Sequence, residues 1–228
     1  MKDHIEHYNK NGFTQPISMF TAEESLTMRN HFFEAIGQTE DKTEHLFYDI
    51  ANWHNKYDWC RNIATHKKIV AMVRGIFGET NVMAWSMLFW YKSALDSTFV
   101  PWHQDGTFWP MKPCKTITAW LALGDVDQHN GALHFIPGLH EQLRPASTLN
   151  HPDSEFILQC PTDSKDIGET RLDMQAGQVC LFDAKTIHRT GPNTSNKARL
   201  ACAIRYSTSD VVFEYEKWPR YKPEPLTV

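Results

Sequence analysis

The sequence predicts an α+β protein in which helices come first and an antiparallel β-barrel or jelly roll follows. Two helix-start and helix-stop patterns fall within the first 80 residues. From about residue 82 the chain changes to short apolar or alternating runs that are separated by turn residues. Helices followed by many strands are typical of this class. Because no Pro/Gly/Ser-rich linker divides the 228 residues, we expect a single domain over 1–228, with helical support in 1–80 and the barrel in 81–210.

The first predicted helix follows Thr21. Thr21 and Glu24 form a capping-box pattern, and Gly37 supplies the stop. Its expected buried face consists of Leu26, Met28, Phe32, Phe33 and Ile36. A second helix is predicted from a cap at Thr65 to a stop at Gly78. We expect residues 38–64, between the two, to be irregular.

Aromatic and β-branched residues dominate the short runs beyond residue 82, and such residues favour strands. The predicted strands are Val82–Tyr91, Thr116–Leu123, Ala132–Ile136, Val179–Phe182 and Arg199–Tyr206. Asn130-Gly131 and Pro137-Gly138 bracket the third of them as turns. Residues 141–169 are polar and contain prolines, so we expect a long excursion from the sheet of the kind that often covers a site.

Charge and composition exclude several classes of protein. Lys and Arg number 23 against 27 Asp and Glu, and a net charge of −4 argues against a general binder of nucleic-acid phosphates. No run of apolar residues is long enough to span a membrane, and the polar N-terminus does not resemble a signal peptide. The five cysteines are odd in number and lack CxxC spacing, which favours free thiols. We therefore expect a cytoplasmic protein with neither nucleic acid nor membrane as a partner; the oligomeric state is not readable.

The first candidate for chemistry is His103-Gln104-Asp105. In a strand, residues two apart share a face, so the imidazole and the carboxylate would point into the barrel together. With a second histidine they would form the 2-His-1-carboxylate triad that holds non-haem Fe(II). A hydrogen-bonded His–Asp pair in the core is the alternative. A second match, His151-Pro152-Asp153, contains a proline and is interpreted as a surface turn.

The second candidate is His188, which follows an apolar strand and precedes a Gly-Pro-Asn turn. Arg199 lies 11 residues further on (199 − 188 = 11), where the last strand opens. An arginine there is usually a salt bridge at the rim, but it can also make a bidentate fork to a carboxylate inside the barrel. Thr190 would share a face with His188 in an extended segment and could add a hydroxyl donor.

Taken in order, these motifs resemble the phytanoyl-CoA dioxygenase family of Fe(II)- and 2-oxoglutarate-dependent oxygenases. The resemblance covers about half the chain, from about Trp85 to Tyr206, and is closest to the bacterial small-molecule branch. It rests on the segments Trp102–Asp105, Thr118–Leu123, Asn130–Leu133, Ile136–His140, His188…Asn193 and Arg199. It implies a double-stranded β-helix, a jelly-roll or cupin-like barrel, with the N-terminal helices packed on its major sheet.

The resemblance assigns roles by position. His103, Asp105 and His188 match the iron ligands, and Arg199 matches the residue that pairs with the distal carboxylate of 2-oxoglutarate. Thr190 matches a hydroxyl partner of that carboxylate, while Gln104 and Trp120 match cosubstrate-contacting positions. His140 matches a family turn in which Leu139 stands where serine is usual, and we interpret it as structural. Because Asp105 is present, halogenation is disfavoured, since halogenases of this family replace that carboxylate.

By the same resemblance, the cofactors are Fe(II), 2-oxoglutarate and O2. The expected reaction hydroxylates an unactivated C–H of a small molecule and releases succinate and CO2. Candidate substrates are natural-product intermediates, amino-acid derivatives and aminophosphonates. Trp90, Phe108, Trp109 and the residues of the 141–169 loop are candidate pocket residues. Core packing is the alternative for the aromatic residues; as a pocket they would suit an apolar skeleton or a quaternary ammonium group. Desaturation, cyclisation or epimerisation remains an alternative outcome, and a non-catalytic binding module is the third hypothesis.

Overall fold

A computed structural model describes residues 1–38, 40, 52–160, 168–217 and 223–228. The α-helices are α1 (Lys2–Asn11), α2 (Ala22–Ile36), α3 (Trp53–Lys56), α4 (Asp58–Ala64) and α5 (Lys67–Phe77). Two short 3₁₀ helices follow, η2 (Asp105–Thr107) and η3 (Tyr215–Lys217). The helices precede almost all of the strands, as the sequence predicts.

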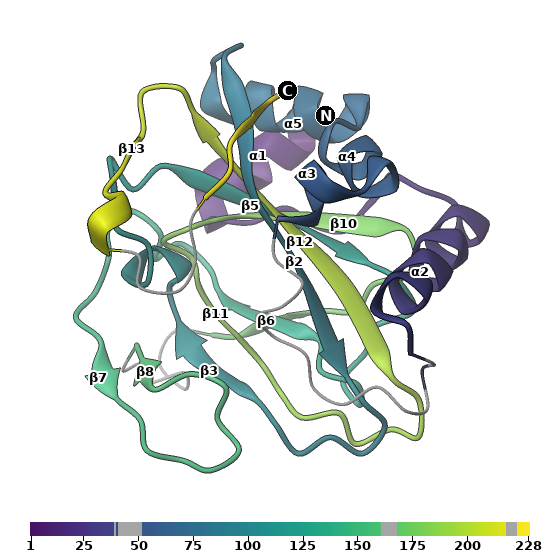
Figure 1. The fold of residues 1–228 in the computed structure, drawn as a ribbon. Helices are drawn as coiled ribbons and strands as arrows, with labels where there is room; N and C mark the ends of the chain where they lie inside the picture. The colour runs from purple at the N-terminus through teal and green to yellow at the C-terminus, as the bar shows by residue number, and fades with distance from the viewer. Residues whose placement is uncertain (39, 41–51, 161–167, 218–222) are drawn as a thin grey trace.

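Two antiparallel sheets face each other and form the barrel (Figure 1). The major sheet has the order β1-β10-β5-β12-β2-β14, formed by Ile17–Ser18, Gln178–Asp183, Thr116–Ala122, Arg199–Thr208, Val82–Lys92 and Leu226–Thr227. The minor sheet has the order β3-β11-β6-β9, formed by Val100–His103, Ile187–Thr190, Leu133–Ile136 and Thr170–Leu172. Two small hairpins lie outside these sheets: β4 (Met111–Lys112) with β13 (Val212–Phe213), and β7 (Ser147–Thr148) with β8 (Leu158–Gln159). The double-stranded β-helix is thereby confirmed, and the five predicted strands correspond to β2, β5, β6, β10 and β12.

Strand alternation divides the major sheet into a helix-facing side and a barrel-facing side. On the first side, Phe89 of β2 packs against Phe32 of α2 and Trp53 of α3, with ring centroids 5.0 and 5.4 Å apart. In Figure 1 the helices lie along this side of the sheet, with the minor sheet on the other. The barrel-facing row of β12 is Arg199, Ala201, Ala203 and Arg205. The two alanines keep the middle of this row small, which leaves space inside the barrel.

Three details of the helical region differ from the sequence prediction. The Thr21–Glu24 capping box is present, but Leu26 is 57% exposed and does not belong to the buried face of α2. Thr65 donates its hydroxyl to the Arg61 carbonyl at the end of α4, while α5 begins after His66 without a side-chain cap. The segment expected to be irregular contains α3 and α4; its residues 39 and 41–51 lie outside the described residues.

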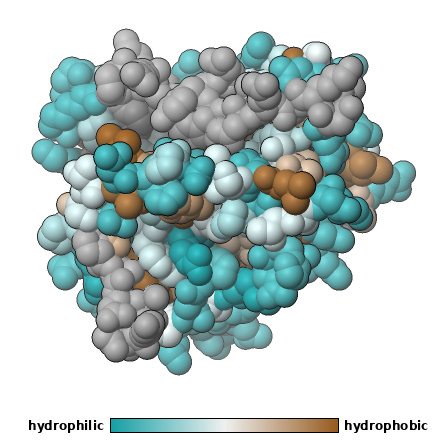
Figure 2. Space-filling view, turned by 90° about the horizontal axis from the view of Figure 1, so that it is seen from below, coloured by the Kyte–Doolittle hydropathy of each residue, from teal (hydrophilic) through white to brown (hydrophobic). Residues whose placement is uncertain are grey.

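The surface and the thiol groups show three further features of the described residues. From below, the coloured part of the surface is mostly hydrophilic, with hydrophobic residues in small separate spots (Figure 2). Among the described residues, no helix combines the length and the apolar character needed to cross a bilayer. The five cysteines are free thiols, as their spacing predicts.

We predict that Gly12 is the least replaceable glycine that joins a helix to the barrel. It ends α1 with φ +87°, and an added Cβ would lie 2.5 Å from Thr186 Oγ1 and 2.7 Å from the His140 ring. Gly12→Ala should therefore lower the free energy of unfolding by about 3 kcal/mol, since a left-handed backbone and an overpacked contact both oppose it. The measurement is urea denaturation.

Gly37→Ala is the matched control, because Gly37 also ends a helix with positive φ but has nothing within 4 Å of an added Cβ. It should cost only the backbone strain, about 1 kcal/mol. Equal losses in the two variants would show that the contact with Thr186 and His140 contributes nothing.

Candidate metal centre and cosubstrate pocket

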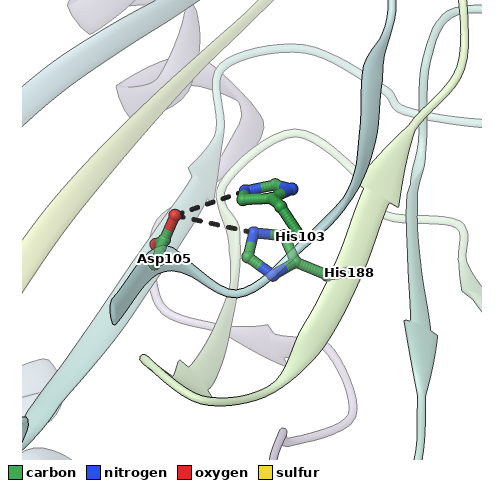
Figure 3. A group of neighbouring side chains, drawn as sticks. All are labelled: His103, Asp105 and His188. Atoms are coloured by element: carbon green, nitrogen blue, oxygen red, sulfur yellow. Dashed lines mark ion pairs between the residues drawn. The ribbon is translucent and has the colours of Figure 1, made fainter. Parts of the chain in front are cut away.

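Two histidines and one aspartate meet between the two sheets (Figure 3). His103 ends β3, His188 lies opposite it on β11, and Asp105 begins η2. One possible ligand atom from each residue lies within 4.8 Å of the others. Asp105 Oδ1 is 3.4 Å from His103 Nε2 and 3.9 Å from His188 Nε2. All three residues are buried, so the group is held by the fold and is not a solvated charge cluster.

Backbone carbonyls orient both imidazoles. The Pro101 carbonyl oxygen is 2.8 Å from His103 Nδ1, and the Thr186 carbonyl oxygen is 2.9 Å from His188 Nδ1. A carbonyl can only accept a hydrogen bond, so in each neutral ring Nδ1 carries the proton and Nε2 keeps its lone pair. Burial lowers the pKa of His188 to about 3, which keeps that ring neutral. Both lone pairs therefore face Asp105, as metal ligands require.

The charge of Asp105 is stabilised by its neighbours. Burial by itself would raise the pKa of this carboxyl group, but the neighbouring side chains of His103, His188 and Arg205 hold the pKa below its usual range. Thr118 of β5 also donates its hydroxyl to Asp105 Oδ2, at 3.3 Å. Asp105 is therefore an ionised buried carboxylate that has a cation site in front of it.

The structure brings His103 and Asp105 together by a different route from the one that the sequence predicts. The strand ends at His103, and Asp105 belongs to a 3₁₀ turn. The prediction that a single strand carries both His103 and Asp105 is therefore wrong for Asp105. Gln104 lies between them with its side chain directed at the 141–144 excursion and the 184–187 turn. It donates to the Gln142 and Lys185 carbonyls and accepts from the Arg144 amide.

A cavity leads from the three residues to Arg199. Its lining includes His103, Asp105, Thr118, Trp120, His188, Thr190, Trp90, Arg199 and Arg205. Arg199 is 3% exposed and donates to the Trp90 carbonyl at 3.1 Å and to the Asn130 carbonyl at 3.4 Å. Burial lowers its pKa to about 10, so it remains a cation near neutral pH. Trp120 lies 5.7 Å from the guanidinium and forms a cation–π contact.

The Arg199 end of the cavity has unused hydrogen-bonding capacity. Within the described residues, the Thr190 hydroxyl is buried without a hydrogen-bond partner, and the guanidinium N–H groups beyond the two bound to carbonyls have none. Unmet donors of this kind fit the carboxylate of a bound ligand. At the other end, two imidazoles and a carboxylate fit Fe(II). The cavity thus has one end whose residues can hold a metal ion and one end whose donors can hold a carboxylate.

The three aromatic residues predicted to line the substrate pocket differ in where they lie. Trp90 lines the cavity. Phe108 lies beside His103, with ring centroids 6.0 Å apart, whereas Trp109 packs against Trp85 and Arg205. Phe156, which the sequence analysis did not single out, has its ring centroid 4.8 Å from that of His103. Phe156 belongs to the 141–169 loop, whose residues the sequence analysis includes among the candidate pocket residues.

Two charged residues of the cavity, Lys92 and Arg205, were missed, whereas a third, Glu155, belongs to the 141–169 loop of candidate pocket residues. Arg205 could have been found, because it lies six residues after Arg199 on the same strand and so on the same face. It donates to Ser86 Oγ at 3.1 Å and lies 4.8 Å from the Trp109 ring. The second His-x-Asp match, residues 151–153, forms the predicted surface turn. His140 packs beside Gly12 and Tyr8.

Comparisons with known proteins agree with this geometry. The chain is 26% identical over 235 residues to a probable alpha-ketoglutarate-dependent hypophosphite dioxygenase of Stutzerimonas stutzeri, covering 93% of this chain and 78% of that protein. It is 25% identical over 232 residues to phytanoyl-CoA dioxygenase 1 of Oryza sativa subsp. japonica, covering 99% and 79%.

Solved structures share the fold. The epimerase SnoN, in a complex with Fe3+, alpha ketoglutarate and nogalamycin RO, superposes with a TM-score of 0.80 at 18% identity over 100% of this chain and 95% of its own. EctD from S. alaskensis gives a TM-score of 0.76 at 17% identity over 94% and 79%. The model of the phytanoyl-CoA dioxygenase (PhyH) family matches residues 8–201. The chain therefore belongs to this family and is a 2-oxoglutarate-dependent non-haem iron dioxygenase that uses Fe(II).

Proposed function

We propose that the protein hydroxylates an unactivated C–H of a small molecule, with His103, Asp105 and His188 as its iron ligands. The observation that carries the proposal is the buried triad, in which two oriented Nε2 atoms face one ionised carboxylate. Three protein ligands leave the remaining iron positions open for exchangeable ligands. A non-catalytic module would have no need of this arrangement.

Arg199 and Thr190 are proposed to bind the distal carboxylate of 2-oxoglutarate. Both line the far end of the cavity, and both offer hydrogen-bond donors there that the described residues do not use. Trp120 is proposed as a wall of the same site, because it lines the cavity and stacks near the guanidinium. Gln104 is proposed as a cosubstrate contact on the family resemblance alone. In the structure its side chain forms hydrogen bonds with backbone groups of Gln142, Lys185 and Arg144.

The bound iron and 2-oxoglutarate supply the oxidising chemistry, with release of succinate and CO2. The chain's own groups position and shield the reaction. The carbonyls of Pro101 and Thr186 fix both imidazoles, and Thr118 fixes the carboxylate. Aromatic rings near His103 exclude water from the metal end, which strengthens the electrostatic contacts made there.

The substrate is proposed to be a natural-product intermediate, an amino-acid derivative or an aminophosphonate. The cavity suits a small molecule, because it lies between the two sheets of the barrel and must hold the cosubstrate as well. The hypophosphite named for the Stutzerimonas relative places small phosphorus oxyanions first among the compounds to be screened. Epimerisation is the second candidate outcome, favoured by the likeness to SnoN in fold. We propose a cytoplasmic location, which five free thiols support.

We predict that His103→Ala and His188→Ala each abolish both the visible band of the Fe(II)–2-oxoglutarate chelate and substrate-dependent succinate release. Loss of a metal ligand should weaken metal affinity by more than ~100-fold, since loss of a partner outside the metal shell already costs 10- to 100-fold. The measurement is an anaerobic titration with Fe(II) and 2-oxoglutarate, followed by a succinate assay.

His151→Ala is the matched control, because this histidine belongs to the other His-x-Asp sequence but lies exposed in a turn. It should leave the band unchanged. A ligand variant that retains the band and couples decarboxylation to product at the wild-type rate would refute the triad assignment.

Arg199→Gln should raise the apparent Kd for 2-oxoglutarate by ~100-fold while leaving Fe(II) affinity nearly unchanged. The expected factor corresponds to losing charge-assisted hydrogen bonds worth about 3 kcal/mol. The same anaerobic titration measures it. Arg189→Gln is the control, because Arg189 points to Glu169 on the outside of β11, and it should bind 2-oxoglutarate normally. Equal Kd values for the two variants would remove Arg199 from the cosubstrate site.

A further inference from the structure

A buried ion pair lies beside Arg199 at the cosubstrate end of the cavity. Lys92 of β2 is the direct cross-strand neighbour of Arg199 on β12. Its ammonium is 3.2 Å from Glu155 Oε1, and the two side chains are 2% and 5% exposed. Lys92 also donates to the Thr98 carbonyl at 2.5 Å. The cavity lining therefore contains two cations and one carboxylate at this end.

The three charges act on one another. The Glu155 carboxylate opposes the lowering of the pKa of Arg199 by burial. Burial also lowers the pKa of Lys92; the Glu155 carboxylate opposes this effect, and the Arg199 charge adds to it. In a buried site such interactions are strong, because little water screens them. A carboxylate in the same cavity lining as Arg199, paired with the cross-strand neighbour of Arg199, is a potential competitor for the guanidinium that the cosubstrate is proposed to need.

Glu155 also belongs to a segment that covers the metal end. The backbone of 153–155 is tied to Phe99 by two hydrogen bonds, Phe99 N to Asp153 O at 2.9 Å and Glu155 N to Phe99 O at 3.0 Å. The next residue, Phe156, places its ring 4.8 Å from that of His103 and 4.9 Å from that of Phe108. The position of Glu155 is thus coupled to the wall that faces His103.

We propose that Lys92 is a positioning residue that holds the Glu155 carboxylate away from Arg199, which keeps Arg199 available to the distal carboxylate of 2-oxoglutarate. The same ion pair fixes Phe156 as a wall of the substrate site beside His103. The inference rests on the proposed cosubstrate role of Arg199. On this proposal, the Lys92–Glu155 ion pair contributes to the affinity for 2-oxoglutarate as well as to packing.

The test is a double-mutant comparison of 2-oxoglutarate affinity. The chelate band of the anaerobic Fe(II) protein is titrated with 2-oxoglutarate in the wild type, Lys92→Met, Glu155→Gln and the double variant. Lys92→Met should raise the Kd at least ~10-fold, because Glu155 is then left to pair with Arg199. Glu155→Gln should bind as tightly as the wild type or more tightly. The double variant should return to within about threefold of the wild type.

Two results would overturn the inference. Wild-type affinity in Lys92→Met would show that the ion pair only contributes packing. A double variant as weak as Lys92→Met would show that Lys92 itself contacts the cosubstrate. If the wild type forms no chelate at all, the proposed function fails instead, so the two failures are distinguishable.

Further variants separate charge from folding. Lys92→Arg keeps the cation and should bind 2-oxoglutarate like the wild type. Lys115→Met breaks the exposed pair with Glu79 and should leave the Kd unchanged. Thermal unfolding of each variant identifies any loss of fold; should Lys92→Met not fold, Lys92→Gln with and without Glu155→Gln gives the same comparison.

Discussion

The burial of one carboxylate between two imidazoles is the constraint on which the rest of this structure depends. An ion in the interior is costly unless partners surround it, and Asp105 obtains its partners from several elements. His103 comes from the minor sheet, Thr118 from the major sheet, and Arg205 adds its charge from β12. The two sheets must therefore be held at a fixed separation. The helices do this indirectly, because the aromatic cluster of Phe32, Trp53 and Phe89 anchors the outer face of the major sheet.

Strand alternation then arranges the cavity. On β12, one face presents a polar, a small, a small and a polar residue to the barrel, while the other packs against helices. Cationic side chains thus occupy both ends of the row, and the alanines between them leave room for a bound molecule. Arg205 serves the metal end through its effect on Asp105, whereas Arg199 lies at the end where 2-oxoglutarate is proposed to place its distal carboxylate.

The sequence predicts the parts of this protein that depend on local pattern. The capping box at Thr21, the alternation of β2 and β12, and the His-x-Asp motif are all visible in a few neighbouring residues. The prediction that Thr65 caps the start of α5 is wrong, because a hydroxyl between two helices can bond to either one. Here it donates to the Arg61 carbonyl at the end of α4. The turn at Asp105 was missed because the i, i+2 relation holds for a strand end followed by a 3₁₀ turn as well as for a strand.

Residues whose role depends on distant packing could not be predicted in this way. Glu155 lies 63 positions from Lys92 in the chain, and no periodicity connects them. A polar excursion usually indicates a solvated loop, so a buried glutamate within it gives no local signal. The sequence includes the whole 141–169 loop among the candidate pocket residues, but it does not single out Phe156, since one phenylalanine in a polar segment has no face to which it can be assigned.

The strands and the 141–169 excursion differ in how freely their residues can change when the substrate specificity of such a barrel changes. Two of the proposed metal ligands, His103 and His188, lie in strands, as does Arg199, and a shift of one residue there would turn side chains to the opposite face. The excursion is under no such constraint, yet it places Glu155 at the cosubstrate end and Phe156 at the metal end. Substitutions there can reshape the substrate wall without moving a ligand. They must still keep the Glu155 charge paired, because an unpaired carboxylate next to Arg199 would weaken the cosubstrate site that every substrate requires.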